Sequence, residues 1–579
     1  MASSCVRLRS GFLLFFLLLS PLFYDSRGQT DPPCPQPDKK TPGPQDLHYI
    51  LELATGDEGP LFHVELYFRG NADGASKLRL PNGWNTQNQL YNAIRNLRAA
   101  SPETKIDGTT QPHVRTITYP ANQVVHVQYD VIQDWPGAAV RNGLFNRVIL
   151  QKVYFYALGT ALWVLPDWDR SRSVSVQLQW KNLPSDWMLC NSFGANEASQ
   201  SFQTTLEGFR KGVFLAGDFR VHGLSIRGRP VQIATRGKWR FPDTEFHSLV
   251  QKVMEAERSF WNDDDFPRYL VVLFPTDDPP GTGHGEARTD ALALYFSKDV
   301  ADTAAMRVLL AHEMFHAWNA SRLRRPEDDN TLYWFSEGFT DHYAALLLWR
   351  AKIISQSEYI ERCNDILRRY YTSRRRNHSY ARIQAERGGD SEAERQIYVR
   401  GATLALRWDA SIRSETGGKH SLDDVMRELF RAARAEGFSL SKDSIDKAAR
   451  RYLKEGVRQD IDLYVETGET IPFSADLLGP ETRMSMIEVS TSFDPGFDLE
   501  ASFAKRIFTG VREHGPAHRA GLRNGQKWVA GGMADDPNVM AEITVEDSGM
   551  RKVVKYYPAS DEKVRVPQYK LKAPPENKN

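Results

Sequence analysis

The sequence predicts a multidomain α+β protein, in which a β-sandwich-like domain precedes a sheet-then-helix domain and a small β-rich domain follows. Three observations support this fold class. A chain of 579 residues is too long for one hydrophobic core. Short runs that alternate apolar and polar residues fill the first third after the N-terminus, whereas apolar residues at helical spacing dominate the middle third. Alternating strands return after about residue 475.

The N-terminus carries the pattern of a secretory signal. Two arginines precede the apolar run FLLFFLLLSPLF, and the small residues Ser26 and Gly28 follow it at positions suited to cleavage. The run is shorter than the roughly 20 residues that a membrane-spanning helix needs. We therefore expect residues 1–28 to be removed, with a Pro-rich leader at 29–45 and a secreted or periplasmic protein without a membrane span. A membrane anchor formed by an uncleaved N-terminal segment is the alternative.

The charge balance and the cysteines narrow the function classes. A formal charge of +1 does not favour nucleic acid or an anionic membrane as the main partner. The mature chain would keep Cys34, Cys190 and Cys363, too few for a disulfide framework, and no CxxC spacing suggests thiolate-bound zinc. One basic segment, LRRYYTSRRRNHS at 367–379, is interpreted as a solvated helix face and loop rather than a nucleic-acid site. If exposed near a cleft, it would favour acidic substrates.

The elements follow in order along the chain. Between residues 46 and 238 the runs HYILELA, FHVELYF, VVHVQYDV and VSVQLQW are separated by turn residues and predict a sandwich. EFHSLVQKVMEAERSFW then predicts a helix, and RYLVVLFP and ALALYFS predict buried strands. The run DDD at 263–265 is interpreted as a solvated turn. Five helices are expected next, at residues 301–321, 335–353, 357–371, 398–413 and 421–435.

The stretch VLLAHEMFHAWN places polar groups in an apolar run. His312 and His316 lie four residues apart, so a helix presents both imidazoles to one point. Zinc takes such nitrogen ligands, and Glu313 can stand beside the metal and take a proton from its water. Two histidines and a glutamate that are only hydrogen-bonded or solvated are the alternative, and the motif by itself does not exclude it.

The next helical stretch, LYWFSEGFTDHYAALL, contains a candidate for the third metal ligand. A catalytic zinc needs a third protein ligand and an open fourth position. Glu337 offers a carboxylate in an otherwise apolar stretch. Asp341 lies one turn later on the same face, where it could accept the second N–H of a liganding histidine and fix its tautomer. The combination favours a metal centre over isolated polar residues.

At this point the sequence resembles a known family. HEMFHAWN, RLRRP, LYWFSEGFTDHYAALLLWRAKIIS, IYVRGATLALRWDASIR and SLDDVMREL together look like the glycyl aminopeptidase family of zinc metallopeptidases. The likeness covers most of residues 240–435. It implies an N-terminal β domain, a thermolysin-like catalytic domain with a glutamate as third ligand, and a C-terminal PDZ-like domain. These agree with the divisions at 46–238, 239–475 and 480–575.

The resemblance implies roles for five residues. His312, His316 and Glu337 would hold one zinc ion per chain, and Glu313 would be the general base that activates the bound water. Tyr398 matches the tyrosine of a YxKG-like stretch and would donate a hydrogen bond to the oxyanion. A tyrosine that only packs at a helix start is the alternative for Tyr398.

The segment before the zinc helix is where the resemblance is weakest. Related aminopeptidases grip the free ammonium of the substrate with a carboxylate in a Gly-rich strip of the GGLEH type. Here the strip at 283–287 is GHGEA, which keeps the first Gly and the Glu. Glu286 is therefore the candidate that binds the substrate N-terminus, with an ordinary loop carboxylate as the alternative. The preference for N-terminal glycine is in doubt.

Strands are expected at KRIFTGV, WVAGG and AEITVED. The segment GPAHRAGLRNGQ lies between the first two and resembles part of a PDZ domain. Such domains bind a peptide at a sheet edge and hold its carboxylate on backbone N–H groups. Pro495 to Asp498, PGFD, is the candidate binding loop. A structural or docking role is favoured over ligand binding there.

These observations predict a zinc metallopeptidase that removes N-terminal residues from peptides. A zinc endopeptidase is one alternative, because the strip around Glu286 is altered. A catalytically inactive scaffold that binds peptides through the PDZ-like domain is the other.

Overall fold

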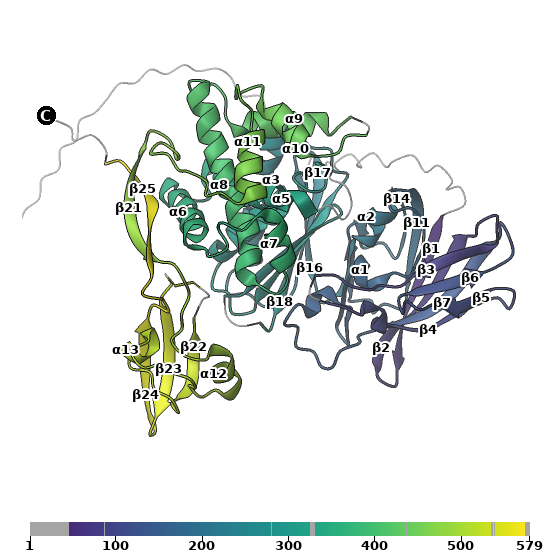
Figure 1. Ribbon diagram of the computed structural model, residues 1–579. Helices are drawn as coiled ribbons and strands as arrows, with labels where there is room; N and C mark the ends of the chain where they lie inside the picture. Colours follow the sequence, from purple (N-terminus) through teal and green to yellow (C-terminus); the bar gives the residue numbers. More distant parts are fainter. Residues whose placement is uncertain are drawn as a thin grey trace, which may run out of the picture. The chain divides into compact units, whose positions relative to one another are not determined.

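The structure, a computed structural model, describes residues 46–573 except 86, 279–280, 325–329, 436, 534–535 and 538 (Figure 1). The expected signal peptide and leader lie outside the described residues. Within the described part of the chain, none of the helices has the length and apolar character to cross a membrane. Cys190 and Cys363 are both buried free thiols, and Cys34 lies outside the described residues.

The N-terminal part is built almost entirely of strands. Its largest sheet has the order β14-β11-β1-β2-β7-β4, with β1 parallel to β11 and antiparallel to β2. Alternate residues of β1 are buried, as the alternating sequence predicts. The strands of this sheet are β1 (Leu47–Gly56), β2 (Gly59–Arg69), β4 (Ile94–Ala99), β7 (Val124–Ile132), β11 (Ser173–Lys181) and β14 (Ser199–Thr205).

Two smaller sheets complete this part, with the orders β10-β3-β6-β5 and β13-β12-β15-β9-β8. Their strands are β3 (Ala75–Arg79), β5 (Lys105–Gly108), β6 (Val114–Thr118), β8 (Ile149–Gln151), β9 (Tyr154–Leu158), β10 (Leu165–Pro166), β12 (Met188–Asn191), β13 (Gly194–Ala195) and β15 (Val213–Gly217). Short helices connect them: η1 (Leu90–Ala93), η2 (Leu144–Asn146), α1 (Gly159–Leu162) and α2 (Leu206–Arg210).

A five-stranded mixed sheet, of order β16-β17-β18-β20-β19, begins the middle part. β18 is parallel to β17 and β20, whereas β19 is antiparallel to β20 and forms the edge. The strands are β16 (Arg220–Ile226), β17 (Arg229–Thr235), β18 (Tyr269–Thr276), β19 (Gly283–Arg288) and β20 (Ala291–Ser297). The strands predicted from RYLVVLFP and ALALYFS are thus confirmed, and both are buried because helices cover the sheet.

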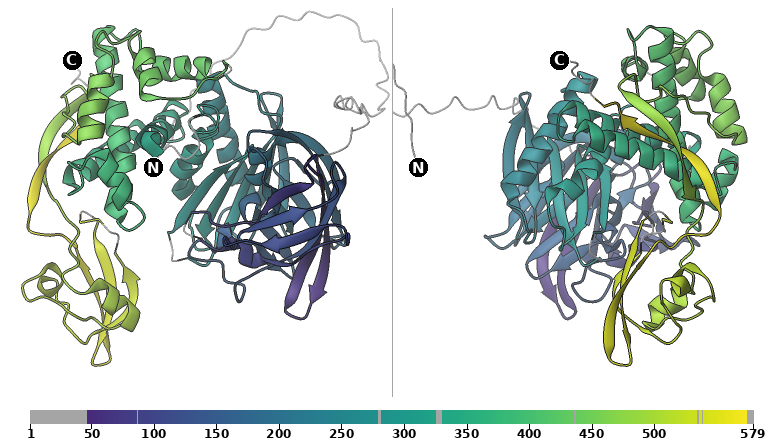
Figure 2. Two further views of the ribbon diagram at one scale, coloured as in Figure 1. Left: turned by 45° about the vertical axis from the view of Figure 1, so that its right-hand side comes forward. Right: turned by 90° about the vertical axis from the view of Figure 1, so that its left-hand side faces the viewer.

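Helices make up the rest of the middle part (Figures 1 and 2). They are α3 (Asp243–Trp261), η3 (Thr303–Met306), α4 (Arg307–Phe315), η4 (Asn330–Leu332), α5 (Tyr333–Arg350), α6 (Gln356–Thr372), α7 (Tyr380–Glu386), α8 (Ser391–Glu415), α9 (Leu422–Ala432), α10 (Lys442–Ala449), α11 (Arg458–Asp460) and the π-helix η5 (Ile461–Thr467). Four of the five expected helices are confirmed with shifted ends, and α8 begins earlier than predicted because Asp390 caps it by accepting from the amides of Glu392 and Ala393.

The helix expected at 301–321 is wrong in its length. Asp302 caps the short η3 instead, and α4 ends at Phe315, although His316 keeps a right-handed helical backbone with φ of −63° and ψ of −17°. The chain then turns, which lets Trp318 and Arg322 donate to Asp263 at 2.9 and 2.5 Å.

Asp263 departs from the interpretation of the DDD run as a solvated turn, since it is only 2% exposed, whereas Asp264 is half-buried and Asp265 is exposed. A buried carboxylate needs such donors to offset its lost hydration.

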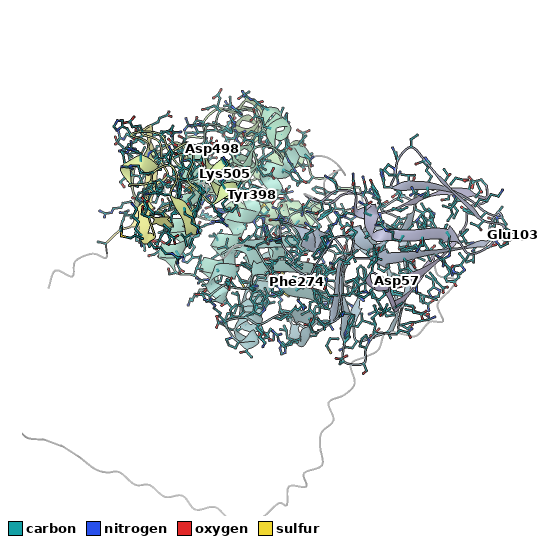
Figure 3. All side chains as sticks on the ribbon, turned by 90° about the horizontal axis from the view of Figure 1, so that it is seen from below. Asp57, Glu103, Phe274, Tyr398, Asp498 and Lys505 are labelled. Atoms are coloured by element: carbon teal, nitrogen blue, oxygen red, sulfur yellow. The ribbon has the colours of Figure 1, made fainter. Side chains whose placement is uncertain are left out.

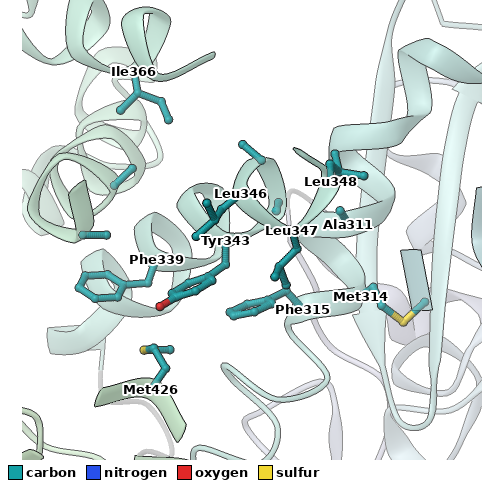
Figure 4. Packing of buried hydrophobic residues seen from close by; sticks show 14 of the residues in the cluster. Ala311, Met314, Phe315, Phe339, Tyr343, Leu346, Leu347, Leu348, Ile366 and Met426 are labelled. Carbon is teal, nitrogen blue, oxygen red and sulfur yellow. The ribbon is translucent and has the colours of Figure 1, made fainter. Parts of the chain in front are cut away.

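The core of the middle part forms where α4 and α5 pack together. Phe315 of α4 stacks on Tyr343 of α5 with ring centroids 5.2 Å apart and planes 7° from parallel. Figure 4 shows both rings beside Phe339, Leu347 and Met314. All five side chains are buried, so this contact fixes α5 firmly against α4.

The C-terminal part holds two small sheets and two short helices. β21 (Thr482–Ser490) pairs with β25 (Lys563–Leu571), and a side chain on α6, Asn364, exchanges two hydrogen bonds of 2.8 Å with the backbone of Tyr569. The other elements are β22 (Lys527–Gly532), β23 (Ala541–Asp547), β24 (Met550–Tyr556), α12 (Leu499–Lys505) and α13 (Pro516–Arg519). WVAGG and AEITVED are confirmed as strands.

One expectation for this part is wrong. KRIFTGV is not a strand: α12 ends at Lys505, and Ile507 makes a single bridge to Lys527. In the PGFD loop two amides are already used within the chain, because the N–H of Gly496 donates to Asp494 at 2.9 Å and that of Asp498 donates to Thr509 at 3.0 Å. Those two amides are unavailable to a peptide carboxylate.

Candidate metal centre and active site

Three side chains from α4, its C-terminal cap and α5 converge on one point. The Nε2 atoms of His312 and His316 lie 3.0 Å apart, and they lie 3.4 and 3.3 Å from Oε2 of Glu337. Among the described residues, these three side chains offer ligand atoms that lie close enough together to hold one metal ion. The four-residue spacing of the histidines on a helix accounts for their meeting, and the contact between α4 and α5 adds the glutamate.

The dimensions of this triangle fit zinc. Ligands about 2.0–2.1 Å from a tetrahedral zinc ion are about 3.3 Å from each other. The three separations match one face of such a tetrahedron, which leaves the fourth position for water or substrate. Nitrogen and carboxylate donors in a two-to-one ratio also suit a catalytic zinc site. The residues present therefore fit the metal.

The pKa shifts in the cluster indicate that a metal ion would replace a proton on His312. Burial alone would lower the pKa of His312, but its hydrogen bonds to Asp341 and Glu337 outweigh burial and raise that pKa well above the usual value. Burial would raise the pKa of Glu337, yet the charge of His316 and hydrogen bonds from both histidines hold it far below its usual range. The metal-free cluster thus keeps a proton on His312 beside an ionised carboxylate, and metal binding releases that proton.

Asp341 orients one of the two histidines. Its Oδ1 lies 3.0 Å from Nδ1 of His312, so the carboxylate accepts the N–H and leaves Nε2 free to face the ligand cluster. Arg362 of α6 approaches the same carboxylate at 3.8 Å. His316 differs from His312, since its Nδ1 is buried without a hydrogen-bond partner among the described residues. A hydrogen bond to a carboxylate therefore orients His312, whereas none of the described residues orients His316 in this way.

Glu313 lies next to the ligand cluster, 8% exposed. Burial raises its pKa, against the opposing charges of His312 and His316. The edge strand β19 runs directly over it: a Cβ on Gly285 would lie 2.4 Å from Cγ of Glu313 and 2.7 Å from its Oε1. Only a residue without a side chain permits this approach. Glu313 thus sits between the ligand cluster and the edge strand.

Tyr398 of α8 lies on the other side of His312, with ring centroids 6.1 Å apart (labelled in Figure 3). The charge of Glu337, together with burial, raises the pKa of Tyr398 well above its usual value. The phenol therefore keeps its proton at neutral pH and can donate it in a hydrogen bond.

The position of Tyr398 depends on a close crossing of two helices. Gly338 of α5 and Gly401 of α8 meet there, and a Cβ on Gly401 would lie 1.8 Å from the carbonyl oxygen of Trp334. Gly338 directly follows Glu337, and Gly401 lies one turn after Tyr398. The crossing thus sets the distance between the tyrosine and the ligand cluster.

Glu286 is on the edge strand β19, 8% exposed, and its carboxylate is already engaged. Arg288 forms a buried ion pair with it, and Trp84 Nε1 and Asn85 Nδ2 donate to the other oxygen, the indole at 3.2 Å. Asn146 adds a donor at 2.6 Å when its amide nitrogen faces the carboxylate. Four donor groups fill the acceptor positions of one carboxylate, so a substrate ammonium would have to displace one of them.

Sequence reasoning missed several of these partners. Trp84 and Asn85 are some 200 residues from Glu286 and carry no local signal. Arg288 did carry a local signal in the sequence, because residues two apart on a strand share a face and Arg288 follows Glu286 by two. Asn319 was also missed: it is buried and donates to the carbonyl of Ser336 at 3.2 Å, which holds the residue before Glu337 in place.

Comparisons with known proteins agree with this geometry. The model of the M61 glycyl aminopeptidase family matches residues 305–403. A crystal structure described as an aminopeptidase N family protein from Idiomarina loihiensis matches with a TM-score of 0.67 at 16% identity, over 91% of this chain and 98% of that chain. An M1 zinc metallopeptidase from Deinococcus radiodurans matches with a TM-score of 0.43 at 15% identity, over 74% and 96%. No curated protein sequence matches the chain.

The match at 16% identity supports the multidomain α+β fold and no more. The family match bears on function, because the matched residues contain both histidines, both glutamates of the centre and Tyr398. Together with the ligand cluster it supports a metallopeptidase. The resemblance of this chain to the M61 glycyl aminopeptidase family, which the sequence motifs predicted, is therefore confirmed over residues 305–403.

Proposed function

We propose that the protein is a zinc-dependent aminopeptidase that acts on short peptides. The observation that carries this proposal is the triangle formed by His312, His316 and Glu337, with Glu313 beside it. The family match supports a peptide substrate and removal of N-terminal residues. From the pattern of residues 1–28, we also propose that the protein acts outside the cytoplasm.

Each residue of the site has a task in hydrolysis. When bound, zinc would polarise the scissile carbonyl and lower the pKa of a water molecule. Glu313 takes the proton of the attacking water on a carboxylate oxygen and passes it to the leaving amine nitrogen. Tyr398 donates its O–H to the carbonyl oxygen, on which negative charge develops. Asp341 keeps His312 in the tautomer that presents Nε2.

A second function, that of an endopeptidase, is favoured by the surroundings of Glu286. An aminopeptidase needs a carboxylate that recognises the free ammonium of its substrate. The ion pair with Arg288 offsets the charge of Glu286, and the donors from Trp84 and Asn85 occupy its lone pairs. A site in which this carboxylate is neutralised would accept a peptide without a free N-terminus equally well.

The two functions are separated by one comparison. The zinc-loaded protein is given a tetrapeptide and its N-acetylated form, and the cleavage products are identified by mass spectrometry. An aminopeptidase releases the first residue of the free peptide and leaves the acetylated one intact, whereas equal cleavage of both would replace our proposal with the endopeptidase.

The variant Glu313→Gln is the control for the chemistry itself. It should keep its zinc, measured by elemental analysis, and lose about 10³-fold or more in kcat, because the amide cannot accept the proton. A fully active variant would remove Glu313 from the mechanism, and a zinc-free wild type with no cleavage of any peptide would favour an inactive scaffold.

A further inference from the structure

The structure contains a polar cavity of about 220 Å³ that the mechanism does not use. The end of α6, the first turns of α8 and the segment at 491–493 line it. It contains part of the basic stretch at 367–379, which the sequence predicts to favour acidic substrates where it is exposed near a cleft. Its lining includes Arg374, Gln396 and Ser492.

Two buried side chains in the cavity lack partners among the described residues. Gln396 is 1% exposed, and no described residue hydrogen-bonds to its amide oxygen or its amide nitrogen. Ser492 is 7% exposed, and its hydroxyl likewise has no partner in the part of the chain that the structure describes. Leaving such groups unsatisfied is costly, and native proteins rarely do so unless a ligand or water completes them. The pair therefore indicates a binding site for a group with oxygen atoms.

The charges of the lining favour an anion. Its acidic groups are already engaged: Asp390 pairs with Arg375 at 2.6 Å, and Glu392 accepts from Ser373 Oγ at 2.7 Å. Asp536 accepts from Arg368 at 2.8 Å. Arg374, in contrast, forms no ion pair within the described part of the chain. The backbone N–H of Arg374 donates to Glu392 at 2.6 Å, and the guanidinium is the group that a carboxylate entering the cavity would meet.

The cavity lies within a few peptide residues of the ligand cluster. On α8, Gln396 precedes Tyr398 by two residues, and Tyr398 stacks on His312. On α6, Arg362 contacts Asp341, and Arg368 follows six residues later, about 9 Å along the helix axis. An extended peptide rises about 3.3 Å per residue, so about three residues span this distance.

The orientation of a substrate follows from what flanks the ligand cluster. The edge strand β19, with Glu286, passes over Glu313 on one side, whereas α8 and α6 approach His312 and Asp341. A peptide whose amino end lies along β19 would cross the cluster with its carboxyl end directed toward the helices. The cavity is then where a short substrate ends.

We propose that this cavity binds the C-terminal carboxylate of a short peptide substrate. Arg374 pairs with the carboxylate, and Gln396 and Ser492 donate hydrogen bonds to it. The inference rests on the proposed peptidase function and adds the substrate class: peptides with about three residues beyond the scissile bond. Longer chains and blocked C-termini lose this contact.

The test compares peptides of equal sequence with a free or an amidated C-terminus. For the zinc-loaded wild type we expect kcat/KM to be about ten-fold higher for the tetrapeptide with a free C-terminus than for its amide. A factor of about ten corresponds to the loss of one charge-assisted hydrogen bond. In Arg374→Gln and Gln396→Leu the ratio should fall to about one. Arg382→Gln, a change at an exposed arginine of α7 outside the cavity, is the matched control and should keep the ratio.

Each outcome decides the proposal. Equal rates for acid and amide in the wild type would overturn it while leaving the peptidase intact, and cleavage of neither peptide would instead overturn the proposed function. A ratio that survives in both cavity variants would overturn the assignment of this cavity. An amidated peptide that carries a glutamate near its end, if cleaved as fast as the free acid, would replace the terminal carboxylate with an acidic side chain. Thermal unfolding curves verify that Gln396→Leu is folded.

Discussion

The crossing of α5 and α8 makes Gly401→Ala an informative perturbation. In a helix interior, alanine is favoured over glycine by about 1 kcal/mol, so without a contact this change would stabilise the protein. Here the new Cβ would lie 1.8 Å from the carbonyl oxygen of Trp334, whereas ordinary contacts begin at 3.4 Å. The helices must therefore separate by about 1.6 Å, the difference between these two distances.

The structure indicates which helix yields. α5 is held against α4 by the stacked rings of Phe315 and Tyr343 inside the core, so α8 is the one to move. Tyr398, one turn before Gly401, then retreats from the ligand cluster. A displacement of about 1 Å in a catalytic group costs up to 10²-fold in rate. We expect kcat to fall by about that factor and the free energy of unfolding to fall by about 1–3 kcal/mol.

The assay measures kcat, zinc content and the unfolding curve, with Ser414→Ala, an exposed site on α8, as the control. The double variant Tyr398→Phe with Gly401→Ala should be no slower than Tyr398→Phe alone, because both changes remove the same hydrogen bond. Full activity in Gly401→Ala with zinc retained would refute the argument. Loss of zinc would show that α5, with Glu337, had moved instead.

Three further predictions address the rest of the site. Asp341→Asn should weaken zinc affinity by about 10–100-fold, measured by competition with a chelator, because His312 loses its orienting acceptor. Since the pKa of His312 is raised in the metal-free protein, zinc affinity should decrease as the pH falls below that pKa, and titration calorimetry in buffers of different ionisation enthalpy should detect proton release on binding. Gly285→Leu should lower kcat by at least ten-fold with zinc content unchanged, because the side chain must displace Glu313; unaltered kcat would contradict the close approach of β19.

The candidate site was predictable from sequence wherever local periodicity determines it. His312 and His316 share a helix face by their spacing alone, and Glu337 and Asp341 do so on the next helix. The structure places these four side chains together because α4 and α5 pack through an apolar contact that the sequence also displays. The hydrophobic pattern likewise predicted the buried strands β18 and β20.

The errors arose where a tertiary partner overrides a local pattern. The helix expected at 301–321 ends early because Trp318 and Arg322 turn toward Asp263, and Asp263, the first residue of the DDD run, is buried for the same reason. KRIFTGV has the composition of a strand but makes a single bridge at Ile507. Each of these segments has its conformation decided by residues far away in the chain, which a periodicity of two or 3.6 does not report.

The two ends of the proposed substrate path are the part that the sequence describes least, and the structure explains why. Recognition of an ammonium or a carboxylate depends on which acceptors or donors are left over after folding. The carboxylate of Glu286 looked available in the sequence, yet Arg288, Trp84 and Asn85 use it. Gln396 precedes the helix expected at 398–413 and carries no signal in the sequence, yet it is buried and its side chain has no partner among the described residues. Catalytic ligands are determined by spacing, whereas substrate specificity is determined by unsatisfied groups, and only the folded chain shows which groups those are.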